Sequence, residues 1–149
     1  MELNCCYYSS FVFIINILIG IYCKYYLYSF LFVILLITSL IYHSNYTDFT
    51  YVVDKTLCLY IVVYGTLLFF QKSIDHFTII NNNNNNILFY IKSILFTSIV
   101  VSFLLVLYLY YYGYYTTQYV FDSDILIALK THSFIHYISA YAHSLIMLL

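Results

Sequence analysis

Charge is scarce in this chain. Of its 149 residues only 7% are charged, the net charge is −1, and 64% are hydrophobic. Soluble domains are about one quarter charged, so these charges are too few to cover a surface that faces water. Nucleic-acid binding, which needs a basic surface, is disfavoured by the same balance. With a mean hydropathy of +0.90, the composition predicts an integral membrane protein whose solvent is the lipid bilayer.

Two patterns that would indicate other classes of protein are also missing. The cysteines, Cys5, Cys6, Cys23 and Cys58, include no CxxC pair, and we expect reduced thiols in or near lipid. Acylation of the adjacent Cys5 and Cys6 is the alternative. No lysine or arginine precedes Lys24, and a cleaved signal peptide would need a basic start. The first apolar run is therefore interpreted as a retained membrane span.

Five apolar runs reach or approach the length of about 20 residues that a membrane helix needs. They are residues 7–23, 25–42, 51–70, 87–112 and 125–149. Backbone groups in lipid must be satisfied within each segment, so continuous runs predict helices, and the absence of alternation disfavours a barrel. We predict a single all-α transmembrane domain over residues 1–149, a polytopic bundle of about five spans. The asparagine tract at 81–86 is predicted to be a disordered loop.

The charges in the loops predict an orientation. With five spans, Lys24 and Lys72 fall on one side of the membrane, and lysines prefer the cytoplasmic side. The side that holds the N-terminus receives Glu2, Asp48, Asp122 and Asp124. We therefore expect the N-terminus to be lumenal or exoplasmic and the C-terminus to be cytoplasmic.

Polar side chains inside the predicted spans follow a pattern. Ser39 and His43 are four residues apart near the end of the second span, and His132 and His136 have the same spacing in the fifth. Residues with this spacing share one face of a helix. Ionisable residues in spans usually face the bundle interior. Counting spans places His132 about 10 Å below the side of the N-terminus, close to the level of His43 and Asp54.

Such a layer has a possible chemistry. Three imidazoles with an open position are a common catalytic zinc site, and zinc makes hydroxide available near neutral pH. A neighbouring carboxylate can take the proton, and a serine hydroxyl can support an oxyanion or a ligand. Each motif alone also has a structural interpretation: paired histidines can simply pack or hydrogen-bond, and Asp54 can favour a helix dipole.

The combination resembles the CREST superfamily of membrane hydrolases, which includes alkaline ceramidases, progestin and adiponectin receptors, and proteins linked to cleavage of GPI-anchor lipids. That family carries SxxxH in its second helix, an aspartate at the start of the third, and HxxxH in the last. Here these motifs are Ser39-Leu-Ile-Tyr-His43, Asp54 and His132-Ser-Phe-Ile-His136. The segments SLIYHS and HSFIHYISA look most like the branch linked to GPI-anchor cleavage.

The resemblance implies a site and a reaction. By it, His43, His132 and His136 would bind zinc, Asp54 would hold the metal-bound water, and Ser39 would support the oxyanion or the site. The implied activity is zinc-dependent hydrolysis of an amide or ester bond in a membrane lipid. No nucleic-acid partner is expected, and no oligomeric state is predicted.

The chain departs from the family in two respects. The family has seven core helices, so this chain would be a shortened version that lacks a hairpin between Phe70 and Ile125. Removing two helices preserves the direction of those that follow. A tryptophan common in the last motif is replaced by Phe134 and Ile135.

Two other functions stay open at this point. One is a non-catalytic multi-pass membrane protein, a degenerate relative that acts as a receptor or scaffold. The other is haem binding through paired histidines. His143 lies on nearly the same helix face as His132 but about 16 Å along the axis, and it is predicted to be a residue of the bundle interior.

Overall fold

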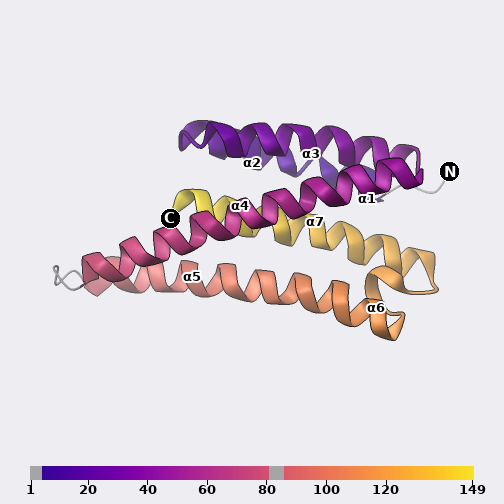
Figure 1. The fold of residues 1–149 in the computed structure, drawn as a ribbon. Helices are drawn as coiled ribbons and strands as arrows, with labels where there is room; N and C mark the ends of the chain where they lie inside the picture. The colour runs from indigo at the N-terminus through magenta and orange to yellow at the C-terminus, as the bar shows by residue number, and fades with distance from the viewer. Residues whose placement is uncertain (1–4, 81–85) are drawn as a thin grey trace.

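Every regular element in the described part of the chain is helical. The computed structural model describes residues 5–80 and 86–149 (Figure 1). The elements are α1 (Cys5–Ser10), α2 (Phe13–Tyr22), α3 (Tyr26–Ser44), α4 (Asp48–Ile80), α5 (Asn86–Leu107), the π-helical turn η1 (Tyr108–Tyr112), α6 (Gly113–Thr116), the 3-10 turn η2 (Tyr119–Phe121) and α7 (Ile125–Leu148). The predicted all-α bundle is therefore confirmed.

The outer surface of the bundle is apolar. Four helical stretches are long and apolar enough to cross a membrane: Cys5–Tyr22, Tyr26–Ser44, Asp48–Asp75 and Phe89–Thr116. Many of their large side chains face outward. Leu18, Leu59 and Leu104, for example, are 61%, 63% and 59% exposed. So much exposed hydrocarbon is expected where lipid is the solvent. The fold is that of a multi-pass integral membrane protein.

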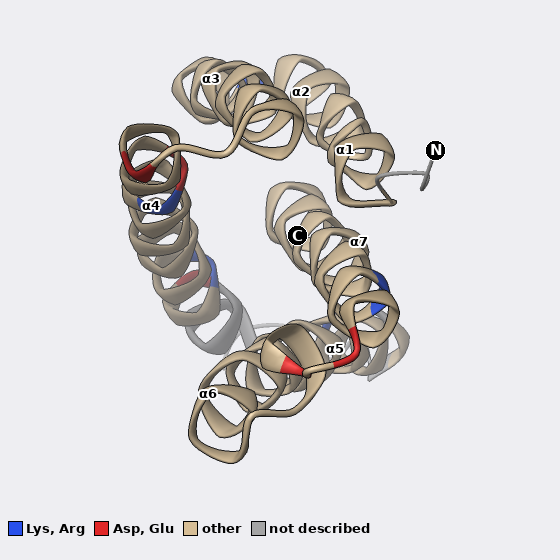
Figure 2. Ribbon diagram, turned by 90° about the vertical axis from the view of Figure 1, so that its right-hand side faces the viewer, with Lys and Arg blue, Asp and Glu red and all other residues tan. Residues whose placement is uncertain are grey.

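Helix α7 differs from these four stretches because it carries one lysine and three histidines. The fifth predicted span is a helix of 24 residues, but Lys130 and three histidines keep it out of the most apolar group. It packs against α1, α2, α4 and α5, and Figure 2 shows it enclosed between the row formed by α1, α2 and α3 and helix α5. Two of its histidines, His136 and His143, are 8% and 3% exposed. The most polar helix is thus the interior one.

The first predicted span, 7–23, is broken in the structure. At the break the N–H of Phe11 donates to Tyr8 and the N–H of Val12 donates to Ser9, so both bonds reach back three residues. The hydroxyls of Ser9 and Ser10 both donate to the carbonyl of Cys6. Side-chain bonds of this kind compete with the helical backbone bonds and bend a helix. The break lets α1 lean against α7 while α2 packs along α3.

The third predicted span, 51–70, forms part of a longer helix. Helix α4 continues to Ile80, because adding residues to an existing helix gains one backbone bond each and polar residues do not stop it. Ser73 donates to the carbonyl of Phe69, and Lys72 reaches the carbonyl of Met147 at the end of α7. Of the predicted loop 81–86, Asn86 is instead the first residue of α5, and residues 81–85 lie outside the described residues.

Aromatic side chains fill the core between α3, α4 and α7. Tyr28 and Phe32 of α3 are completely buried, and both rings pack against His143. Gly65 of α4 faces this group. A Cβ atom at Gly65 would lie 2.8 Å from the Nδ1 atom of His143 and closer still to the hydroxyl of Tyr28. The absence of a side chain at Gly65 therefore allows α4 to approach the buried rings.

We predict that Gly65→Ala lowers the free energy of unfolding by about 1–2 kcal/mol. Overpacking against two buried rings costs about 1–3 kcal/mol, of which the higher helix propensity of alanine returns up to about 1 kcal/mol. Thermal unfolding in detergent, followed by circular dichroism, measures the effect. Val63→Ala is the matched control, because Val63 lies on the same helix and is 50% exposed. A Gly65→Ala protein as stable as the parent would contradict the close approach.

Candidate metal centre

Three imidazole rings meet inside the bundle. His43 comes from the last turn of α3, and His132 and His136 are one turn apart on α7. The ring centroids are 5.1 Å apart for His43 and His132, 5.3 Å for His43 and His136, and 5.0 Å for His132 and His136. One nitrogen from each ring can be chosen so that all three lie within 4.8 Å of one another. The structure thus brings together the three histidines singled out in the sequence.

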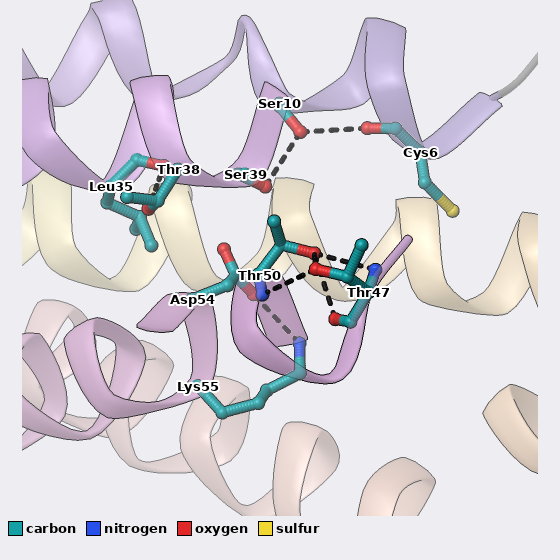
Figure 3. Close-up of polar contacts among 9 residues, drawn as sticks. All are labelled: Cys6, Ser10, Leu35, Thr38, Ser39, Thr47, Thr50, Asp54 and Lys55. Carbon is teal, nitrogen blue, oxygen red and sulfur yellow. Dashed lines mark hydrogen bonds and ion pairs between the residues drawn. The ribbon is translucent and has the colours of Figure 1, made fainter. Parts of the chain in front are cut away.

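The turn between α3 and α4 places the other predicted site residues near this end of the bundle. The hydroxyl of Thr50 accepts from the N–H of Thr47 at 2.9 Å, and the hydroxyl of Thr47 accepts from the N–H of Thr50 at 3.1 Å. These reciprocal bonds cap the start of α4 in the manner of a capping box (Figure 3). Helix α4 therefore begins soon after His43, and Asp54 follows within two turns.

Asp54 is buried and only half paired. It is 2% exposed, and its Oδ2 atom accepts from the Nζ atom of Lys55 at 3.0 Å (Figure 3). Lys55 also lies over the ring of Tyr42, 5.0 Å from its centroid, which helps to hold the cation in an apolar setting. The Oδ1 atom is buried and has no hydrogen-bond partner among the described residues. A buried carboxylate oxygen of this kind is suited to a water molecule or a ligand as its partner.

The ion pair of Asp54 and Lys55 lies close to the histidines. The Nζ atom of Lys55 lies 5.0 Å from the centroid of the Tyr42 ring, and the ring centroids of Tyr42 and His43 are 4.6 Å apart. Asp54 itself is not a member of the histidine group. Its position therefore suits contact with something bound to the histidines better than direct ligation.

Ser39 contacts α1 through its hydroxyl group. It is 2% exposed, and its hydroxyl is 3.0 Å from the hydroxyl of Ser10 (Figure 3). It lies one helical turn before His43, as the sequence spacing predicts. The structure thus places Ser39 in a layer of hydroxyl groups between α1 and α3, beside the three rings.

Sequence reasoning missed three hydroxyl groups that contact this region. Ser9 lies 2.8 Å from the Nδ1 atom of His136, Ser10 contacts Ser39, and the hydroxyl of Tyr28 bonds Nδ1 of His143. All three residues lie in apolar runs and follow no motif spacing. The only signal was general: a hydroxyl inside a span needs a partner on a neighbouring helix. His143 is interior, as predicted, and it stands outside the group of three.

The donor set fits zinc. Imidazole nitrogens are common zinc ligands, and three of them leave a fourth tetrahedral position for another molecule. Two nitrogens at zinc distances of 2.0–2.1 Å would be about 3.4 Å apart in a tetrahedral site, within the 4.8 Å that bounds the three nitrogens here. Side-chain adjustments that bring nitrogens within 4.8 Å of one another to about 3.4 Å would give the three histidines this geometry.

Comparisons with protein-family models, curated proteins and solved structures found no match for this chain. The geometry of the three histidines is thus the main basis for a functional assignment.

We predict that the bond between Tyr28 and His143 stabilises the bundle independently of the three-histidine group. Tyr28→Phe leaves the buried Nδ1 atom without its partner, which costs about 1–3 kcal/mol. His143→Leu in the Tyr28→Phe background removes the unsatisfied nitrogen, so the double variant should be less destabilised than the sum of the two single variants. Thermal unfolding of the four proteins measures this coupling, and strictly additive effects would contradict the contact.

Proposed function

We propose that this chain is a multi-pass membrane hydrolase that uses zinc to cleave an amide or ester bond in a membrane lipid. The observation that carries the proposal is the meeting of three imidazoles from α3 and α7, with nitrogens within 4.8 Å of one another. The order of the motifs, which resembles that of the CREST superfamily, supports the same activity.

Each residue has a proposed role. His43, His132 and His136 hold the zinc, which when bound supplies Lewis acidity and makes hydroxide available from water near neutral pH. Asp54 orients the attacking water through its Oδ1 atom and takes its proton, which then passes to the leaving amine or alcohol. Ser39 supports the site from the side of α1.

The depth and surroundings of the site support a lipid substrate. His43 is the next-to-last residue of α3, so the site lies near the end of a membrane helix and not at its middle. The amide and ester bonds of membrane lipids lie at the same level, between the headgroups and the hydrocarbon. The exposed apolar surface of the helices suits the acyl chains. The loop charges support a lumenal or exoplasmic position for this end of the bundle.

One contact favours the second candidate function, a non-catalytic receptor or scaffold. The Oδ2 atom of Asp54 is already paired with Lys55 at 3.0 Å. In this alternative Asp54 and Lys55 would form a structural ion pair, and the histidines would have no reaction to support.

Zinc content tests the proposal directly. We expect about one zinc ion per chain in the purified protein, because a three-histidine site binds zinc tightly, and we expect its loss in His43→Ala and in His136→Ala. His143→Gln should keep the metal, since His143 stands outside the group. Lowering the pH should release the zinc, because protonated imidazoles cannot be ligands. Parent protein without stoichiometric zinc would rule the proposal out, and a Soret band would indicate haem instead.

Asp54→Asn distinguishes the two candidate functions. The amide keeps the size of the side chain but cannot take a proton, so hydrolysis of fluorescent amide-linked or ester-linked lipids should fall by about 10²–10⁴-fold. Zinc content should stay at the parent level, because Asp54 is not among the three ligands. A non-catalytic protein would show no hydrolysis to lose, and equal activity in the parent and the variant would exclude the proposed role.

A further inference from the structure

One histidine of the candidate centre, His136, forms a hydrogen bond with Ser9 of α1. Ser9 is 1% exposed and His136 is 8% exposed. The Oγ atom of Ser9 lies 2.8 Å from the Nδ1 atom of His136, although the two residues are 127 positions apart in the chain.

The number of protons on Ser9 decides the direction of this bond. A hydroxyl group has one proton, and a carbonyl oxygen can only accept. The Oγ atom of Ser9 donates that proton to the carbonyl of Cys6 at 3.0 Å. It can then meet Nδ1 of His136 only as an acceptor, so His136 must carry its proton on Nδ1.

A proton fixed on Nδ1 leaves the lone pair of His136 on Nε2. The bond made by one ring nitrogen sets the tautomer and therefore the nitrogen available to a metal. The opposite tautomer would place a proton on Nε2 and block ligation there. The carbonyl of Cys6 thus controls, through Ser9, which nitrogen of His136 is free to bind.

We propose that Ser9 is a positioning residue for His136, which fixes the Nδ1–H tautomer and directs Nε2 toward His43 and His132. Its consequence for metal affinity rests on the proposed zinc function, whereas its effect on the tautomer does not. Ser10, the next residue, donates to the same carbonyl at 2.8 Å but contacts Ser39 instead of a histidine. Ser10 therefore provides a matched control on the same turn of α1.

The first measurement uses metal-free protein labelled with 15N-histidine in detergent micelles. In the parent, the nitrogen resonances of His136, assigned by their loss in His136→Ala, should show the Nδ1–H tautomer. Ser9→Ala should shift these resonances toward the other tautomer or a mixture, and Ser10→Ala should not. A parent His136 that carries its proton on Nε2, or an unchanged tautomer in Ser9→Ala, would overturn the proposal.

The second measurement is the zinc dissociation constant, by competition with a chelator. Loss of an orienting partner behind a ligand typically weakens metal binding by about 10–100-fold, so Ser9→Ala should weaken it by this factor. Ser10→Ala should stay within about threefold, and Ser9→Thr, which keeps the hydroxyl, should restore tight binding. If Ser9→Ala does not fold, Ser9→Cys keeps the shape with a poor acceptor and is compared in the same way. A parent that binds no zinc would refute the proposed function, and the tautomer measurement would still decide the role of Ser9.

Discussion

Most hydrogen-bonding groups buried in this bundle find partners within the protein, because the surrounding hydrocarbon offers none. The need for hydrogen-bond partners is greatest on α7, where His136 and His143 are almost completely buried. Each of these histidines forms a hydrogen bond with a hydroxyl group from another helix. His136 bonds Ser9 of α1, and His143 bonds Tyr28 of α3. These two contacts require α1 and α3 to lie against the same polar helix. The interior position of α7 and the arrangement of the N-terminal helices around it follow from this requirement.

The same requirement joins stability and the candidate function. The break between α1 and α2 comes from serine hydroxyls that bond the carbonyl of Cys6, and it also brings those serines to the histidine centre. The cap formed by Thr47 and Thr50 starts α4 where Asp54 can lie near the three rings. In this part of the bundle, the same residues determine the course of the backbone and the position of the groups in the candidate site. Substitutions at α1 should therefore affect chemistry and folding together, unless a matched neighbour separates the two.

The sequence predicted the helical class from its continuous apolar runs, and it singled out the three histidines that the structure brings together. Apolar runs determine helices in lipid, and a spacing of four residues places His132 and His136 on one face. Helix α4 extends beyond the predicted span, since polar residues such as Gln71 and Lys72 do not end a helix. Ser9, Ser10 and Tyr28 were missed for a different reason. Their partners are distant in the chain, and the position of a hydroxyl group within an apolar run does not indicate which residue it will contact.

Helix α3 has a length that bears on how the bundle fits a membrane. Its 19 residues span about 28 Å at 1.5 Å per residue, and the stretch from Cys5 to Tyr22 has 18 residues. Both lengths are close to the thickness of the hydrocarbon core of a bilayer, about 30 Å. The 28-residue stretches Asp48–Asp75 and Phe89–Thr116 exceed that thickness and must tilt or project into water. The N-terminal hairpin is therefore nine or ten residues shorter than the other two stretches, so those stretches must tilt more or extend further beyond the hydrocarbon than the hairpin does.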